Sequence, residues 1–291
     1  MKIFDCFMYF DEDLVLDLRL NYLDKYVDKF IIIESKYNHR GQEKKAQFDI
    51  NKFPKFEKKI KYLFLNEEPD GIEEVIENDG EGEKSRKLIL NAAKRENFQR
   101  NCIDKMLDEA SENDWIIVSD LDEIPNLENK ELKQTDCQLV FFKQHMIYYK
   151  FNLILENFPW IGSRACKKKY LKSPQWLRNL KFKKRPFWRL DKYRLNSIIE
   201  KGGWHFCNLK KPEDLLYKYK NMAETKDDFF AKDGVDGKID SKYLSVAQIE
   251  DSIKEGRNLV GKKEYFKKIE IDNTFPEYIL KNIEKYRDWI S

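Results

Sequence analysis

The sequence predicts an α/β protein built on a mixed sheet with helices on its faces. Apolar runs of strand composition alternate with amphipathic segments in the first part of the chain. One strand, Trp115–Val118, is apolar throughout, as strands inside parallel sheets are, and carboxylates follow it. Helix-starting residues (Pro212, Ser245 and Pro276) recur late in the chain and predict C-terminal helices.

The composition is that of a soluble globular protein with a heavily charged surface. The chain has 291 residues, of which 37% are charged and 41% are hydrophobic. This length allows one large domain or two, each able to bury a core. The net charge is only +3, from 55 basic and 52 acidic residues, so no global field favours a nucleic acid partner.

The cysteines and the N-terminus predict a cytoplasmic protein. The five cysteines are scattered, odd in number and form no Cys-x-x-Cys pair. A disulfide framework or a zinc site is therefore not expected, and a reducing compartment fits better. Lys2 is soon followed by Asp5, unlike a signal peptide, and no run approaches the ~20 apolar residues that span a membrane.

The first elements open an α/β sheet. Strand composition extends over Lys2–Phe10, and Asp13 is placed to cap a leucine-rich helix. Phe30–Ile33 predicts a second buried strand, which ends at Glu34, and Ile60–Leu65 predicts a third.

A long helix is expected before the acidic strand. Residues 66–84 are acidic and contain glycine, which predicts a loop. Ser85–Ala110 has apolar residues at helical spacing without Pro or Gly. Its Arg95 and Arg100 form either a solvated stripe or, if they face the acidic strand, part of a site.

The second half is rich in strands and aromatic residues, and then turns basic. Cys137–Phe151 has strand composition, and Arg164–Arg189 interleaves lysines and arginines with aromatic residues. Such a stretch can bind a sugar acceptor, nucleic acid or an anionic membrane surface, or it can be an ordinary charged face. Ile198–Phe206 ends in Gly-Gly-Trp-His-Phe, and helices are expected over 212–222, 245–255 and 276–290.

The acidic turn after Trp115–Val118 predicts a metal site. Asp120, Asp122 and Glu123 fall within four residues. If the segment is extended, Asp120 and Asp122 point the same way and repel each other unless a cation lies between them. Hard oxygen ligands suit Mg²⁺ or Mn²⁺, and α/β sheets bind ligands at the carboxyl ends of their strands. A solvated acidic turn is the alternative interpretation.

Taken together, the chain resembles glycosyltransferase family 17. The matching blocks follow the family order from about residue 2 to 226. They are Asp5-Cys6-Phe7, Phe10, Glu12, Leu18-Arg19-Leu20, Val27-Asp28-Lys29-Phe30, Ile33-Glu34-Ser35, His39, Gly41, Arg95–Asn101, Ser119–Pro125, Gly203–Phe206 and Lys218-Tyr219-Lys220.

The resemblance implies a GT-A-like fold with a Rossmann-type nucleotide half, forming one catalytic domain over residues 1–291. Within it, residues 1–125 would form the nucleotide-sugar half, 126–226 the acceptor half and 227–291 a helical extension. The resemblance also implies a divalent metal and inversion at the anomeric carbon. The donor would be a nucleotide sugar, with uridine diphosphate N-acetylglucosamine (UDP-GlcNAc) as the family-based expectation, and the acceptor a glycan hydroxyl.

These implications assign roles to individual residues. Asp122 is the first metal ligand expected, Asp120 would bind metal or ribose, and His205 would complete the Mn²⁺ or Mg²⁺ site. A buried histidine packed beside its tryptophan neighbour is the alternative for His205. Glu34 and either Arg95 or Arg100 would contact the nucleotide.

An inverting reaction needs a general base near the acceptor hydroxyl. Glu123, next to the metal site, and Glu224, after the His205 block, are the candidates, in that order. Either could instead be an ordinary acid.

The start of the sequence differs from that of animal members of the family. Those proteins carry a membrane anchor and a lumenal stem, whereas this sequence starts at its first strand. We therefore expect a cytosolic enzyme acting on a different acceptor, such as a free or lipid-linked glycan. Peripheral membrane contact through residues 164–189 is a further expectation.

Two other functions are consistent with parts of the sequence. A metal-dependent nucleotidyltransferase would use a similar sheet, but no phosphate-binding glycine-rich loop appears between Lys2 and Glu34. A non-catalytic module could bind glycans or an anionic surface through Arg164–Arg189. It would be sensitive to charge reversal at Lys183 or Arg185 and insensitive to Asp122→Ala.

Overall fold

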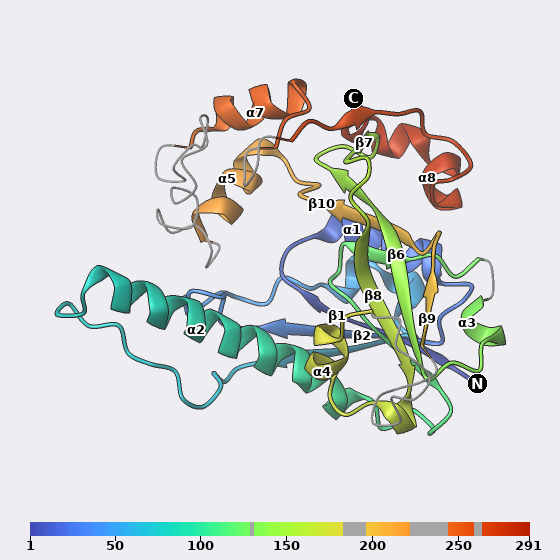
Figure 1. The fold of residues 1–291 in the computed structure, drawn as a ribbon, viewed down its shortest axis with the longest axis horizontal. Helices are drawn as coiled ribbons and strands as arrows, with labels where there is room; N and C mark the ends of the chain where they lie inside the picture. Colours follow the sequence, from blue (N-terminus) through green and yellow to red (C-terminus); the bar gives the residue numbers. More distant parts are fainter. Residues whose placement is uncertain (129–130, 183–195, 222–243, 259–263) are drawn as a thin grey trace.

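The computed structural model describes residues 1–128, 131–182, 196–221, 244–258 and 264–291. The strands of these residues form one mixed sheet with the order β11-β7-β6-β8-β4-β1-β2-β3, to which β5, β9 and β10 are joined beside β6 (Figure 1). The strands are β1 Ile3–Tyr9, β2 Lys29–Ser35, β3 Ile60–Leu65, β4 Trp115–Val118, β5 Glu123–Pro125, β6 Leu139–Tyr148, β7 Leu153–Ile154, β8 Trp160–Lys167, β9 Asn196–Ile199, β10 Gly203–Cys207 and β11 Lys267–Lys268.

Helices cover both faces of this sheet. They are α1 Asp13–Leu23, α2 Glu81–Asn101, α3 Glu131–Gln134, α4 Pro174–Asn179, α5 Pro212–Asn221, α7 Val246–Lys254 and α8 Glu277–Lys281, with 3₁₀ turns that include Cys102–Met106 and Ile283–Trp289. α2 and α4 pack against β1, β2, β4 and β8, and α1 packs with α8. Figure 1 shows α5 and α7 together beyond the end of β10.

The core lies on both faces of the parallel strands. In β2, Phe30 and Ile32 belong to the hydrophobic cluster that includes α1, and Ile31 and Ile33 belong to the cluster on the opposite face. All four are fully buried, as are Trp115–Val118 in β4. Alternate residues of a strand point to opposite faces, so an entirely apolar run is the pattern that a doubly covered strand requires.

The sheet topology brings acidic strand ends to one edge. β4, β1, β2 and β3 are parallel neighbours, while β8 is antiparallel to both β4 and β6. The carboxyl ends of β1, β2 and β4 therefore lie at the same edge of the sheet. β5 follows the acidic turn after β4 and pairs with β10, which itself runs parallel to β6.

The predicted fold class is confirmed: the protein is a mixed α/β sheet flanked by helices, with further helices late in the chain. Ser245 caps α7 through a reciprocal capping box with Gln248, as its position predicted. The division at residues 125 and 226 stays a prediction.

Three helix predictions are wrong in detail. Asp13 is the first residue of α1 and accepts a hydrogen bond from the Tyr9 hydroxyl at 2.6 Å, and it does not cap the helix. α2 begins at Glu81, where acidic residues in the first turn suit the helix dipole, and it tightens into a 3₁₀ turn at Cys102.

The third difference is at the C-terminal end. The helix predicted over 276–290 is two pieces, α8 and the Ile283–Trp289 turn, separated at Asn282. The Asn282 side chain donates to the Tyr278 carbonyl at 2.8 Å and its backbone leaves the helical region, a local competition typical of asparagine.

The five cysteines are free thiols, so the expectation of no disulfide framework is confirmed. In the part of the chain that the structure describes, no helix has the length and apolar character that crossing a bilayer requires.

Candidate active site

Arg19 of α1 binds the backbone of the acidic turn, residues Asp120–Glu123. Its guanidinium pairs with Asp5 of β1 through hydrogen bonds of 2.7 and 2.6 Å, and both side chains are fully buried. The same guanidinium donates to the carbonyls of Asp120, Leu121 and Glu123 at 3.0, 2.8 and 3.1 Å. One side chain therefore fixes the turn that carries all three predicted carboxylates.

This segment is a turn, and the expectation that Asp120 and Asp122 point the same way is wrong. The Glu123 amide donates to the Asp120 carbonyl at 3.1 Å and closes the chain on itself. The alternation of an extended strand is lost across such a turn. Asp120 consequently faces two arginines, and Asp122 faces His205.

Asp120 lies between Arg100 of α2 and Arg178 of α4. Its Oδ1 is 3.0 Å from Arg100 Nη2, and its Oδ2 is 2.7 Å from Arg178 Nη2. Burial opposes ionisation of this carboxyl, but the charges of Arg178 and Arg100 outweigh it and hold its pKa below the usual range. Of the two alternatives that the sequence left open for Arg100, a solvated stripe or a position facing the acidic strand, the structure shows the second; 39% of the Asp120 side chain is exposed.

Glu123 is completely buried behind Asp120. Its Oε1 accepts from Trp160 Nε1 at 2.6 Å and from Arg178 at 2.9 Å, and its Oε2 accepts from the Asp120 amide at 3.0 Å. Burial and the neighbouring Asp120 charge raise its pKa. These contacts give Glu123 the role of positioning Arg178 and Trp160. As a general base it stays a prediction, and Glu224 lies outside the described residues.

The structure brings together Asp122, in the turn before β5, and His205 of β10. β5 and β10 pair so that His205 is opposite Glu123, and the Phe206 amide donates to the Asp122 carbonyl at 2.9 Å. His205 Nε2 is then 3.4 Å from Asp122 Oδ2. Burial alone would lower the pKa of His205, but Asp122 raises it; the histidine in turn lowers the pKa of Asp122.

Asp122 and His205 suit a divalent cation, whereas Asp120 does not in this arrangement. His205 Nδ1 is buried and has no hydrogen-bond partner among the described residues, so this ring nitrogen can still form a hydrogen bond. Within the described residues, no three acidic, histidine or cysteine side chains form a ready metal cage. Mg²⁺ and Mn²⁺ sites often use one or two protein ligands and take the rest from substrate phosphates and water. Both oxygens of Asp120 are already bound to arginines.

Glu34 and Arg95 lie on the same edge of the sheet but contact neither Asp120 nor Asp122. Glu34 is fully buried, pairs with Lys44 and accepts from the amides of Gln47 and Phe48 at 2.8 and 3.1 Å. Arg95 pairs with Glu68 at 2.5 Å. In this structure Glu34 and Arg95 order the loops after β2 and β3, and their contact with a nucleotide stays a prediction.

Two residues of the site escaped the sequence analysis. Arg178 was one cation among many in the basic stretch, and Trp160 carried no motif. Ser173 caps α4 just before its first residue: its hydroxyl accepts from the Trp176 amide at 3.1 Å, and this cap starts the short helix that carries Arg178 to Asp120. A capped helix inside a basic stretch is the only local signal that could have singled out Arg178.

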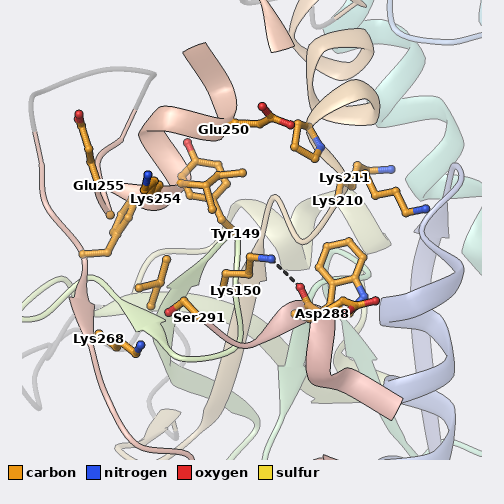
Figure 2. A pocket seen from close by; sticks show the side chains of 16 residues that line it. Tyr149, Lys150, Lys210, Lys211, Glu250, Lys254, Glu255, Lys268, Asp288 and Ser291 are labelled. Carbon is orange, nitrogen blue, oxygen red and sulfur yellow. Dashed lines mark hydrogen bonds between the residues drawn. The ribbon is translucent and has the colours of Figure 1, made fainter. Parts of the chain in front are cut away.

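A separate cavity of about 560 Å³ lies beyond the ends of β6 and β10 (Figure 2). Tyr149, Lys150, Lys210, Phe266 and Trp289 contribute to its wall, and none of the clustered carboxylates does. Figure 2 shows Lys150 directed at Asp288, whose carbonyl accepts its hydrogen bond at 2.6 Å. The cavity and the acidic turn are therefore distinct features.

The family model for glycosyltransferase family 17 matches residues 1–290. The chain therefore belongs to this family and is a glycosyltransferase. No curated protein sequence matches it significantly.

Similar solved structures are distant. HddC from Yersinia pseudotuberculosis shares 15% identity and a TM-score of 0.32, over 77% of this chain and 99% of HddC. Its complex described as containing GMP-PN gives 15% and 0.31, over 69% and 91%. The 2-C-methyl-D-erythritol 4-phosphate cytidylyltransferase of Francisella tularensis gives 12% and 0.29, over 76% and 100%.

Proposed function

We propose that this glycosyltransferase moves a sugar, N-acetylglucosamine by the family resemblance, from a nucleotide diphosphate sugar to a hydroxyl of a glycan, with inversion. The observation that carries the proposal is the convergence of two opposite kinds of group at the end of β4. Asp122 and His205 approach to 3.4 Å, and beside them Arg100 and Arg178 both bind Asp120. Cation-binding and anion-binding groups together suit a diphosphate leaving group and its metal ion.

Asp122 and His205 are the residues that would hold Mn²⁺ or Mg²⁺. When bound, the ion would neutralise the charge that develops on the departing nucleotide diphosphate. The protein's own contribution is to fix these two ligands: Arg19 holds the turn that carries Asp122, and the β5–β10 pairing holds His205. Both side chains would therefore be in place before any substrate arrives.

Arg178 is the residue best placed to contact the diphosphate. Its guanidinium bonds to Asp120 and Glu123 and also donates to the Gly162 carbonyl at 3.2 Å. A guanidinium held in this way keeps a fixed orientation, and its fork matches phosphate oxygens. Asp120 then acts as the counter-charge that keeps Arg178 and Arg100 in place.

The basic stretch contributes to this site, which favours catalysis over a separate binding surface. Arg178 reaches Asp120, while Lys168 and Lys169 bond to Asp104 and Asn113 at 2.7 and 2.8 Å. Several charged side chains in the described part of the stretch therefore bind other residues of the same chain. Peripheral membrane contact through 164–189 and a cytoplasmic location stay predictions, and Lys183 and Arg185 lie outside the described residues.

The proposal is tested by a thermal-shift panel of nucleotide sugars, with and without Mn²⁺. We expect one nucleotide sugar to stabilise the wild-type protein by about 2.7 kcal/mol at a concentration near 100 times its dissociation constant. The shift should require Mn²⁺ and disappear in Asp122→Ala and His205→Ala. Asp108→Ala, which removes an acid whose side chain is 68% exposed, is the matched control and should keep it.

Two outcomes would count against the proposal. If no nucleotide sugar stabilises the protein, the donor assignment fails. If stabilisation persists unchanged without divalent metal and in Asp122→Ala, the donor is bound but the metal assignment fails.

A further inference from the structure

We infer that Phe158 and Trp160 form a platform on which a pyranose ring of the acceptor glycan stacks, next to the site that holds the donor. This inference rests on the proposed function, since it assigns the acceptor side of the same reaction. It starts from an exposed aromatic side chain at the border of the carboxylate cluster.

Phe158 is unusual for this protein. The other described phenylalanines are buried or partly buried, whereas Phe158 is 43% exposed. A large aromatic group left in water carries a solvation cost that burial elsewhere would remove. Single exposed apolar residues are common on protein surfaces, so the neighbours of Phe158 decide whether it has a function.

Those neighbours form a row of rings that leads to the metal ligands. The Phe158 and Trp160 rings are nearly parallel, with an interplanar angle of 16° and centroids 6.5 Å apart. The Trp160 and His205 rings follow, with centroids 5.2 Å apart and a tilt of 32°. His205 contacts Asp122, so the row starts in solvent and ends at the proposed donor site.

The local sequence fixes this arrangement. Pro159 holds its own φ near −65° and disfavours a helical conformation at Phe158, so the segment Phe158-Pro159-Trp160 stays extended. Residues two apart in an extended segment project to the same side, which places both rings together. The preceding Asn157 has a φ of 60° and turns the chain into this segment.

Trp160 is held rigidly. Its indole N–H donates to Glu123 at 2.6 Å, and Glu123 is itself bound to Arg178 and to the Asp120 amide. Gly162 permits this close packing, because a Cβ there would lie 2.9 Å from Glu123 Cδ and 3.0 Å from Trp160 Cδ1. The tryptophan is therefore oriented before a ligand binds, which lowers the entropic cost of binding.

A sugar ring is the occupant that fits this chemistry. A pyranose has one face of C–H groups, which pack on an aromatic ring, and a rim of hydroxyls that remain hydrated or hydrogen bonded. Phe158 supplies an exposed apolar ring without a charge, and the polar groups lie at the inner end, at His205 and Asp122. An acceptor sugar stacked there would extend from solvent toward the donor, which is the direction in which its hydroxyl must approach.

The test measures binding of neutral trisaccharides to the protein. Wild type is titrated with the trisaccharides of β1,4-linked N-acetylglucosamine, of mannose, of glucose and of galactose, with UDP and Mn²⁺ present. Saturation-transfer NMR reports the dissociation constants. We expect at least one trisaccharide to bind, and Phe158→Ala to weaken its binding about tenfold, the loss typical of a central aromatic contact.

Three further variants separate ring stacking from structural damage. Phe158→Tyr keeps the ring and should bind within about twofold of wild type, while Phe158→Leu keeps apolar area without a ring and should resemble Phe158→Ala. Tyr265→Ala removes an aromatic ring that is 59% exposed in the C-terminal part and should bind as wild type. Circular dichroism and melting temperature check that all variants fold.

The outcomes distinguish this inference from the proposed function. If no trisaccharide binds wild type, or if Phe158→Ala binds the trisaccharide as tightly as wild type, the platform is wrong. The donor-induced thermal shift is measured on the same preparations. Loss of that shift in wild type would refute the donor site, whereas a normal donor shift with Phe158-independent sugar binding would refute the platform alone.

Discussion

Two arginine–carboxylate groups lie on opposite sides of the acidic turn, and they differ in burial and in what they bind. Beneath the turn, Arg19 and Asp5 are fully buried, and Arg19 also binds three backbone carbonyls. Above it, Arg100 and Arg178 bind Asp120, whose side chain is 39% exposed.

The difference shows how one loop can be both rigid and able to bind ligand. Arg19 binds three carbonyls of the turn, and for the Leu121 carbonyl no other donor is found among the described residues, so it belongs to the folded scaffold. The Arg100 and Arg178 side chains are themselves only 2% and 13% exposed, but both contact Asp120, which is 39% exposed and where an anionic ligand can compete for their N–H groups. The Arg19–Asp5 group therefore fixes the backbone of the turn, whereas Arg100 and Arg178 offer positive charge to a ligand.

The largest expected effect comes from breaking the lower group. Arg19→Met should lower the free energy of unfolding by about 3–5 kcal/mol, because it leaves the Asp5 charge buried without a partner. Denaturant unfolding followed by tryptophan fluorescence measures this loss. Lys25→Met, which removes an ion pair whose lysine is 52% exposed, is the control and should change stability by less than about 1 kcal/mol.

The double variant Asp5→Leu/Arg19→Met sharpens the same comparison. Replacing both members of a buried pair often restores stability, but here the Leu121 carbonyl would still lose its Arg19 donor, and the Asp120 and Glu123 carbonyls would keep only the Glu123 amide and the Ser163 hydroxyl. We expect little recovery. Full recovery would show that only the Asp5 contact matters and that Arg19 does not hold the turn.

Breaking the upper group should affect activity more than folding. Arg178→Ala is expected to lower kcat/KM about 10²–10³-fold, the usual cost of removing one donor to a developing negative charge. Arg178→Lys keeps the charge but not the fork and should recover only part of this loss. Initial rates with a nucleotide sugar provide the measurement. An Arg178→Ala enzyme with wild-type kinetics would place the diphosphate elsewhere.

Glu34 is a third buried carboxylate and can be compared with the two groups. The question is whether it stabilises the fold, as the Arg19–Asp5 pair does, or contacts the donor. It pairs with Lys44 and accepts from two amides and from the Tyr62 hydroxyl. If its role is structural, Glu34→Gln should cost about 1–3 kcal/mol of stability and leave the donor dissociation constant unchanged. A weaker donor affinity with unchanged stability would instead support the predicted nucleotide contact.

The smallest effect is expected at an ion pair outside both groups. Burial would raise the pKa of Asp24, but hydrogen bonds from Lys59 and Lys55 outweigh it and lower that pKa. Because the folded-state pKa is the lower one, this stabilisation is present above the unfolded pKa of about 3.9 and is lost as the pH falls through the folded value.

Asp24→Asn should therefore reduce stability by less than about 1 kcal/mol at pH 7. The difference from wild type should vanish at the acidic end of a denaturation series, where both proteins carry a neutral side chain at this position. A difference that does not depend on pH would show that the carboxylate charge is not its source.

The sequence by itself determined the elements that depend on local patterns. The apolar run Trp115–Val118 predicted a doubly buried strand because each of its faces needed an apolar neighbour, and Ser245 predicted its own helix cap. The family blocks placed Asp120, Asp122 and His205 in one site, and the structure brings Asp122 and His205 within 3.4 Å.

Only the tertiary structure decided which partner each of those residues contacts. Local alternation predicted that the two aspartates point the same way, but the contacts of Arg19 and the pairing of β5 with β10 turn them toward different partners. Arg178 and Trp160 come from distant segments without a motif, and their roles depend on where α4 and β8 pack. Spacing along the chain predicts neighbours on one element, whereas contacts between elements follow from the packing of the whole sheet.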